Sequence, residues 1–416
     1  MLLSYFLVVA AAAVDNQLMG QEVLYTATKV PDRINITFNG NPATSFAVNW
    51  RSDSTMILPM VEMALASDSS TARPELEMPF RSSSKASTEI LVMGGFKTLH
   101  HSHTFSDLEP ETLYAFRVGQ EKYWSEWFHY RTASDQNESF SFIYLGDAQN
   151  NIKSMWSRTI RQAFSDQPNA SFILHAGDLI NRRHEWEWDE WFYAGSFIHS
   201  MIPVVPVTGN HEHPKTQEGK RVLMPNWIQQ FTLPENGPKN SQETDYYVDY
   251  QGARIVILNS SLFQDNDGYR KEQIEWLHEI LSSNPNKWTL ISYHHPMSKG
   301  VLVEELKPIL EKYDVDLAMQ GHVHSYSRGI TWNGADYKGG PMYTVSVSGP
   351  KFYDLNELNG FDMMRSGHHK QLYQIININR DELTYQAYTT TGKLYDEFKI
   401  IKKKNQKKFI NNLKSK

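Results

Sequence analysis

The sequence predicts an N-terminal all-β sandwich followed by a larger α/β domain whose mixed β-sheets are flanked by helices. The chain has 416 residues, which is more than one hydrophobic core usually holds. Short β-rich runs separated by turns fill residues 23–134. From residue 140 onward, apolar strands alternate with helical segments at intervals of about thirty residues. Hydrophobic residues make up 40% and charged residues 21% of the chain, so disorder is not expected.

Residues 23–134 hold the predicted sandwich. The runs RINITFNG (33–40), SFAVNWRS (45–52) and TLYAFRVG (112–119) are rich in β-branched and aromatic residues, and turn-forming Asn, Gly, Asp and Pro residues separate the runs of this region. The stretch TASDQNES (132–139) is polar, as expected for a linker between two domains.

Residues 140–401 are predicted to form the α/β domain. The run SFSFIYLGD (139–147) predicts its first strand, and apolar residues at every fourth position predict a helix over 152–165. Strands return after residue 340, which predicts a sheet completed by antiparallel hairpins.

The two ends of the chain differ from the rest in composition. Residues 1–22 combine an apolar stretch with small residues, which resembles a secretory signal peptide and leader, so a secreted or periplasmic protein is expected. That stretch is too short to span a bilayer, and no transmembrane segment is predicted. Residues 402–416 carry seven Lys and no acid, which favours a basic disordered tail over a nucleic-acid or membrane contact. The acidic remainder of the chain argues against a nucleic-acid partner.

Potential metal ligands follow the apolar runs of the predicted α/β domain. Cysteine is absent, so any metal must be held by His, Asp, Asn, Gln, Glu or Tyr. The residues at the ends of these runs are Asp147, Asp178, Asn210 with His211, His294, and His322 with His324. A single Gly-Asp is usually an ordinary turn or helix cap. Because ligands bind at the carboxyl ends of strands in α/β sheets, the whole series predicts one shared metal site.

This mixture of ligands suits a pair of divalent metal ions. Two ions ~3.5–4 Å apart can clamp a phosphate and lower the pKa of a bridging water from ~16 toward ~7. If Asp147 and Asp178 are the only anionic ligands, two divalent ions leave a positive site that attracts a phosphate dianion. Carboxylate, amide and imidazole ligands together favour Mn, Fe or Zn.

Five short blocks carry a resemblance to a known family. Gly-Asp-Ala-Gln (146–149), Gly-Asp-Leu-Ile-Asn (177–181), Gly-Asn-His-Glu (209–212), Ile-Ser-Tyr-His (291–294) and Gly-His-Val-His (321–324) resemble the five blocks of the calcineurin-like metallophosphoesterases. With a fibronectin III or immunoglobulin-like sandwich in front, the chain most resembles the plant-type purple acid phosphatases, from about residue 28 to about residue 401. The resemblance implies a secreted hydrolase of phosphate monoesters that uses a metal-bridged hydroxide.

The resemblance also implies individual roles. Asp178 corresponds to the carboxylate that bridges the two metals. The other ligands it implies are Asp147 and His324 for the first metal, and Asn210, His294 and His322 for the second.

Substrate-facing roles are implied for the residues next to these ligands. His211 corresponds to the histidine that orients the substrate or protonates the leaving group. Glu212 and His295 are expected to line the pocket, although His295 is equally compatible with packing or with support of a metal ligand.

The sequence departs from the purple acid phosphatases at one ligand. The tyrosine that binds ferric iron, three residues after the bridging aspartate, is replaced by Asn181. Relatives without this tyrosine usually have a histidine two residues after the first aspartate, where this chain has Gln149. Either amide can complete the first metal site, and Gln149 is favoured because it directly follows the strand end. The centre is therefore expected to be divalent and colourless.

Two alternatives to a phosphomonoesterase stay open. A phosphodiesterase or nucleotide pyrophosphatase can use the same site, with selectivity from segments 213–245 and 351–370. The polar residues of these segments are Lys215, Lys220, Arg221, Arg365, His368 and His369, most of which are compatible with plain surface. In a different class, an adhesion or carbohydrate-binding protein with a relict hydrolase domain can use Trp124 and Trp127 of the sandwich.

Overall fold

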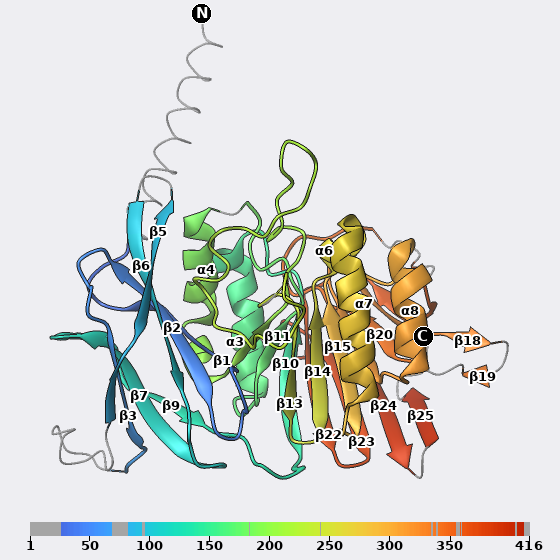
Figure 1. Cartoon of the computed structure of the whole chain (residues 1–416). Coiled ribbons are helices and arrows are strands. Elements are labelled where there is room, and N and C mark those ends of the chain that lie inside the picture. Colours follow the sequence, from blue (N-terminus) through green and yellow to red (C-terminus); the bar gives the residue numbers. More distant parts are fainter. Residues whose placement is uncertain are drawn as a thin grey trace, which may run out of the picture.

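Figure 1 shows the computed structural model of the chain, in which a β-sandwich lies beside a larger α/β region. The structure describes residues 26–68, 82–93, 96–182, 184–241, 243–333, 336–337, 340–354, 358, 360–403 and 406–411. The expected leader, residues 1–22, lies outside the described residues. Among the described helices, none combines the length and apolar character that crossing a bilayer requires.

The N-terminal region is a two-layered β-sandwich, as predicted. One layer contains β1(Asp32–Thr37), β2(Phe46–Asp53), β6(Phe96–Phe105) and β5(Ser87–Met93). The other contains β4(Ser82–Lys85), β3(Met60–Leu65), β7(Leu113–Gln120), β8(Tyr123–Trp124) and β9(Phe128–Arg131). Inward-facing residues of both layers form one core, in which the ring of Phe46 lies 4.4 Å from that of Tyr130 and 5.4 Å from that of Phe116. Strand alternation thus places one face of each layer inside.

The first layer of the sandwich continues into the α/β region. Strand β1 pairs in parallel with β12(Val204–Pro206), so one sheet runs from β5 to β25. Asp189 of α4(Glu185–Gly195) reinforces the junction by pairing with Arg33 at 2.9 Å and Arg51 at 2.7 Å. Pairing with β12 satisfies the edge of β1, which would otherwise be exposed.

Two mixed sheets form the α/β region. The first continues with β10(Phe140–Leu145), β11(Ile173–His175), β22(Leu372–Asn379), β23(Glu382–Thr389) and β24(Leu394–Lys403). The second has the order β13(Tyr246–Tyr250), β14(Ala253–Leu258), β15(Trp288–Tyr293), β16(Leu317–Gln320), β20(Met342–Val345), β17(Tyr326–Ile330) and β21(Asp362–Gly367). A small hairpin, β18(Trp332–Asn333) and β19(Asp336–Tyr337), stands apart.

Helices cover the outer faces of these sheets. They are η1(Ile152–Trp156), α3(Ser157–Asp166), α4, α5(Phe197–Met201), α6(Ser260–Asp265), α7(Asp267–Ser282), η2(Leu302–Leu306) and α8(Lys307–Lys312). The helix predicted over 152–165 is confirmed by η1 and α3. Successive side chains of β14 point to opposite faces of the sheet. Val256 and Leu258 share a core with α7, whereas Ile255 and Ile257 belong to the core between the sheets.

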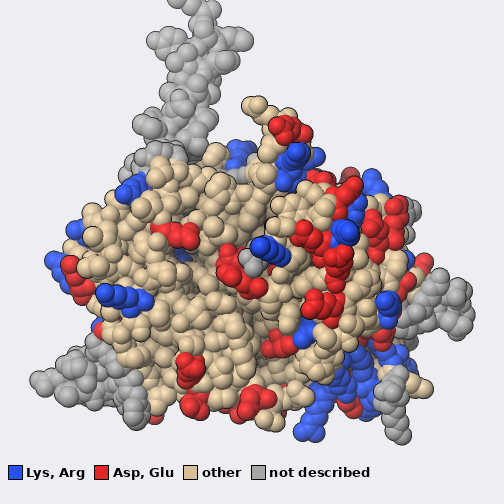
Figure 2. Space-filling view, viewed as in Figure 1, with Lys and Arg blue, Asp and Glu red and all other residues tan. Residues whose placement is uncertain are grey.

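The prediction of a disordered basic tail is wrong for residues 406–411. These residues form β25(Gln406–Asn411), which pairs antiparallel with β24. The lysines are offset by acids, since Lys407 Nζ lies 2.6 Å from Asp314 Oδ1 and Lys402 Nζ lies 3.0 Å from Asp316 Oδ2. Figure 2 shows Lys and Arg gathered at the lower right, the side where Figure 1 places β24 and β25. Ion pairs with residues far away in the chain therefore stabilise a strand that the local composition does not predict.

Candidate metal centre

The structure brings the predicted metal ligands together at the carboxyl ends of five strands. Strands β10, β11 and β12 of the first sheet and β15 and β16 of the second end at this place. The ligand candidates gathered there are Asp147, Gln149, Asp178, Asn210, His294, His322 and His324. The site therefore lies where two sheets meet, rather than at the edge of one open sheet.

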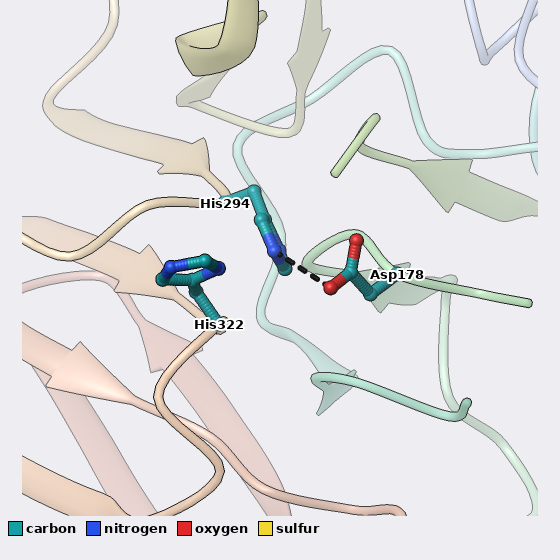
Figure 3. A group of neighbouring side chains, drawn as sticks. All are labelled: Asp178, His294 and His322. Carbon is teal, nitrogen blue, oxygen red and sulfur yellow. Dashed lines mark ion pairs between the residues drawn. The ribbon is translucent and has the colours of Figure 1, made fainter. Parts of the chain in front are cut away.

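One group of ligands surrounds Asp178 on the side of the second sheet. Figure 3 shows the ring of His294 directed toward the carboxylate of Asp178, with His322 close by. The Nε2 atom of His294 lies 3.1 Å from Asp178 Oδ2. The Oδ1 atom of Asn210 lies 3.2 Å from His294 Nε2 and 2.8 Å from His322 Nδ1. These four side chains converge as ligands of one ion would.

A second group shares the same aspartate. Ligand atoms of Asp147, Asp178 and His324 all lie within 4.8 Å of one another, and Asp178 also forms such a group with His294 and His322. The side chain of Gln149 completes the second group, because its Nε2 atom lies 3.0 Å from Asp178 Oδ2 and 2.9 Å from His324 Nε2. Asp178 is thus placed between two potential ion positions.

Unmet polar atoms show that these residues fit metal ions. Asp147 Oδ1 and Gln149 Oε1 are buried without a hydrogen-bond partner. Buried polar atoms in native proteins are normally paired, so each of these atoms is unfavourable unless a ligand satisfies it. Carboxylate and amide oxygens combined with imidazole nitrogens form the donor set that divalent Mn, Fe or Zn prefers.

The histidine orientation also suits metal binding. His294 Nδ1 lies 2.8 Å from the carbonyl oxygen of Ala176 and donates to it, which leaves Nε2 as the ring nitrogen that faces Asp178. Metal-binding histidines commonly donate their second ring N–H in this way, which fixes the tautomer and the ring orientation. The backbone N–H of His322 donates to Asp147 Oδ2 at 2.7 Å and fixes that carboxylate in turn.

The backbone of the centre has unusual geometry. Asp147 and Asp178 both have φ of 52°, and His322 and His324 have φ of 77° and 49°. The left-handed region is unfavourable for residues with a side chain, and such strain persists where surrounding structure enforces it. Gly209 allows close approach, because a Cβ atom there would lie 2.1 Å from Asp178 Oδ1. The Gly-Asp and Gly-Asn-His motifs therefore reflect tight packing around the ligands.

Burial and charge shift the pKa values of the carboxylates in opposite directions. Burial raises the pKa of Asp147 to about 8, although the charge of His294 acts against it. Asp178 is also buried, but His294 and His211 outweigh that effect and hold its pKa well below the usual range. His294 has a pKa raised to about 9, because Asp178 and Asp147 overcome the effect of burial. The site therefore attracts positive charge strongly.

His211 lies at the rim of the centre. Its side chain is 22% exposed, whereas that of Asp178 is 1% exposed. Its backbone N–H donates to Asp178 Oδ1 at 2.9 Å, and its Nδ1 atom donates to the backbone carbonyl of Asn181. Asn181 thus contacts the predicted substrate histidine through its main chain.

Glu212 and His295, expected to line the substrate pocket, are both buried, and His295 takes the supporting position that the sequence left open as an alternative. Glu212 is fully buried and accepts hydrogen bonds from the backbone N–H groups of Asp178 (3.0 Å), Leu179 (2.9 Å) and Gly209 (2.7 Å). Glu212 therefore fixes the backbone of the loop that carries Asp178. His295 is also buried, contacts Ser260 Oγ at 2.9 Å and supports the His322 ring, with ring centroids 4.5 Å apart.

The structure adds two residues that sequence reasoning missed. The ring of Tyr353 meets that of His324 edge-on at 5.0 Å, and its N–H lies 3.4 Å from the His324 carbonyl. Besides burial, which is the largest effect in both cases, the positive charge of Lys351 lowers the pKa of Asp147 and of His324. Both residues lie beyond β20 within the segment 351–370, which was expected to supply selectivity, but no motif singles them out, so only the structure reveals their contacts.

The polar residues of segments 213–245 and 351–370 differ in burial and in their contacts. Arg221 donates to the carbonyl oxygen of Asn210 at 3.3 Å. Lys220 is exposed at the surface, and Arg365 donates to the carbonyl oxygen of Tyr395 at 3.2 Å. Lys215 is exposed as well. Arg221 is therefore the member of this set that contacts a ligand segment directly.

The tryptophans of the sandwich are half-buried rather than open. The guanidinium group of Arg117 lies 4.5 Å from the ring centre of Trp124 and 4.8 Å from that of Trp127. Trp124 Nε1 also donates to the carbonyl oxygen of Glu121 at 2.7 Å. The cation–π contact with Arg117 occupies one face of each ring.

Two family models match this chain. Residues 140–326 match the family model of the calcineurin-like phosphoesterases, and residues 31–132 match that of the purple acid phosphatase N-terminal domain. The chain therefore consists of a calcineurin-like phosphoesterase domain preceded by a purple acid phosphatase N-terminal domain.

Comparison with known proteins gives distant relatives of the same kind. Purple acid phosphatase 23 of Arabidopsis thaliana is 24% identical over 272 residues, which are 55% of this chain and 57% of that protein. Probable inactive purple acid phosphatase 27 of the same plant is 24% identical over 269 residues, 55% of this chain and 43% of that protein. The chain thus spans about half the length of these relatives. The structure of purple acid phosphatase PPD1 from yellow lupin (Lupinus luteus) seeds shares the fold, with a TM-score of 0.72 and 18% identity over 90% of this chain and 74% of that one.

Proposed function

We propose that this chain is a secreted dinuclear-metal phosphomonoesterase of the acid phosphatase type. The observation that carries the proposal is the position of Asp178, which belongs to both ligand groups. Two divalent ions held there, drawn from Mn, Fe and Zn, would supply a clamp for phosphate and an activated water. With Asp147 as the second carboxylate ligand, the loaded centre would carry net positive charge and attract a phosphate dianion.

Within this proposal, Gln149 completes the first ion site and Asn181 does not. The side chain of Gln149 is fully buried, and its terminal nitrogen lies between Asp178 and His324. A half-turn of the amide exchanges its oxygen and nitrogen, which places Oε1 at the same point as a ligand. Asn181 contributes its backbone carbonyl to His211 instead.

His211 acts on the substrate in this proposal. Its Nδ1 proton is held by the carbonyl of Asn181, and its partly exposed ring faces the rim of the centre. The Nε2 atom can therefore hold a proton for the oxygen of the leaving alcohol, as a general acid does. The fixed ring also restricts how a phosphate ester approaches the ions.

A phosphodiesterase or nucleotide pyrophosphatase is the second candidate. One observation favours it, namely a hollow of about 550 Å³ that begins at Asn151, two residues after Gln149. Two cations, Lys153 and Arg161, one acid, Glu190, and the aromatic residues Trp186 and Tyr193 line this hollow. Cations and aromatic rings together suit a large phosphorylated leaving group.

The proposal is tested with an aryl phosphate monoester and the matching diester on one metal-loaded preparation, with and without chelator. Faster, chelator-sensitive hydrolysis of the monoester is expected, and the Asp178→Asn variant serves as the inactive control. Faster hydrolysis of the diester would replace the first candidate by the second. Absence of both activities in protein that binds no metal would favour a binding protein with a relict hydrolase domain.

A further inference from the structure

A second group of potential metal ligands lies outside the centre. Asp354, His368 and His369 each offer one ligand atom, and these atoms all lie within 4.8 Å of one another. Asp354 Oδ1 is 3.8 Å from His368 Nδ1 and 3.9 Å from His369 Nε2. Two imidazole nitrogens and one carboxylate oxygen thus converge on one point at the protein surface.

The backbone explains why two consecutive histidines face the same carboxylate. Neighbouring residues of an extended strand point to opposite sides, so both rings would normally diverge. His369 instead adopts a φ of 57°, directly after β21 has ended at Gly367. The two rings consequently lie with their centroids 4.4 Å apart, and the ring of Phe352 packs on His369 at 3.9 Å.

The Nδ1 atom of His368 points to a missing ligand. The side chain of His368 is 42% exposed, yet its Nδ1 atom is shielded from water and has no hydrogen-bond partner. A shielded nitrogen without a partner is unfavourable, and an ion bound between His368 and Asp354 would satisfy it.

We propose that Asp354, His368 and His369 bind one divalent metal ion of the zinc class, separate from the dinuclear centre. Zinc binds imidazole nitrogen and carboxylate oxygen at about 2.0–2.2 Å, so ligand atoms in a tetrahedral site lie about 3.3 Å apart. Small rotations of these surface side chains suffice to close the observed separations. Three protein ligands leave at least one position of the ion for water or an outside ligand.

The position of this outer site connects it to the centre. Asp354 directly follows Tyr353, whose ring contacts His324. An ion that joins Asp354 to His368 and His369 therefore fixes both ends of the segment between them. It also restrains Tyr353, which contacts the ring of His324.

The outer site is tested by counting bound Zn²⁺ per chain after equilibrium dialysis of the full chain against buffered Zn²⁺. The His368→Ala/His369→Ala double variant is expected to bind one ion fewer than the wild type, and Asp354→Asn is expected to bind that ion more weakly. His129→Ala is the matched control, since His129 is an exposed histidine on β9 of the sandwich. Equal counts in the wild type and the double variant would overturn the proposal.

A further variant separates this proposal from the proposed function. Asp178→Asn is expected to lose ions from the centre and to keep the outer ion. A wild-type chain that binds a single ion, lost in the double variant and retained in Asp178→Asn, would support the outer site while contradicting the dinuclear centre. Thermal unfolding with and without Zn²⁺ provides a second measurement, because an ion bound only to the folded state raises the Tm. The Tm increase is expected to be smaller in the double variant than in the control.

Discussion

Two regions of this molecule bury carboxylates, and they satisfy them differently. At the junction of the sandwich and the α/β region, Asp189 accepts hydrogen bonds from the guanidinium groups of Arg33 and Arg51. In the metal centre, Asp147 is also buried, but its Oδ1 atom has no hydrogen-bond partner. Burial by itself therefore does not distinguish a functional carboxylate from a structural one; for Asp147, the unmet oxygen gains meaning because it lies beside other potential metal ligands.

The backbone conformation of the buried aspartates also differs between the two regions. Asp189 lies within helix α4, in which its φ is ordinary. Asp147 and Asp178 both have φ of 52°, a conformation that costs of order 1–3 kcal/mol for a residue with a side chain. The junction thus stabilises the fold. The centre instead contains residues in a strained backbone conformation, which stability alone would not favour.

The largest effect is expected from Asp178→Asn, which keeps the size of the shared side chain and removes its charge. Substitutions outside the ligand shell of a metal commonly reduce activity 10- to 100-fold, so loss of the shared ligand should reduce kcat/KM at least about 100-fold. Monoester hydrolysis under excess metal measures this effect, and circular dichroism checks the fold. Near wild-type turnover would show that Asp178 is not shared between two ions.

Asp189→Ala should affect stability rather than chemistry. It removes the carboxylate that Arg33 and Arg51 share, but Arg33 keeps Glu185 and Arg51 keeps Asp32 as ion-pair partners. The free energy of unfolding should therefore fall by about 1–3 kcal/mol, less than for a buried charge left without any partner. Urea unfolding measures this loss, and turnover per folded molecule should change little. An unchanged unfolding midpoint would contradict the assignment of this region to stability.

A third kind of buried group, His175, has neither an ion-pair partner nor a place in the centre. Burial lowers its pKa to about 3 from an ordinary value of 6.5. Because the folded pKa is the lower one, its contribution is fully present above pH 6.5 and is lost as the pH falls toward 3. The free energy of unfolding should fall by about 1.4 kcal/mol per pH unit in that window. His175→Leu should flatten the pH profile relative to His129→Leu, and identical slopes would refute this assignment.

The smallest effect distinguishes the two amides near the first ion position. Gln149→Ala should weaken metal binding by about tenfold, and Asn181→Ala should weaken it less, because Gln149 lies between Asp178 and His324. Competition with a chelator measures both affinities. The iron-loaded wild type should show no tyrosinate–iron absorption band, whereas Asn181→Tyr should gain one. A visible band in the wild type would argue for ferric binding by another phenolate.

Local sequence signals were sufficient for the main elements and for the order of the metal ligands. Asp147, Asp178, Asn210 and His294 each follow an apolar strand within a few residues, so the strand and its polar end are readable together. The helix over 152–165 has the same local basis, because its buried residues recur at helical spacing. These features depend on neighbours in the chain, which is why they can be predicted without the fold.

Tertiary structure decided what depends on partners far away in the chain. The pairing of β1 with β12 joins the sandwich to the α/β sheet. Strand β25 forms in place of the expected tail, where it pairs with β24 and Lys407 forms an ion pair with Asp314. Glu212 contacts backbone N–H groups around Asp178 instead of substrate. The outer cluster forms only when the turn at His369 meets Asp354. Sequence therefore determined which residues end the strands, and long-range contacts determined which of their side chains meet, since hydrogen bonds and charges act through space rather than along the chain.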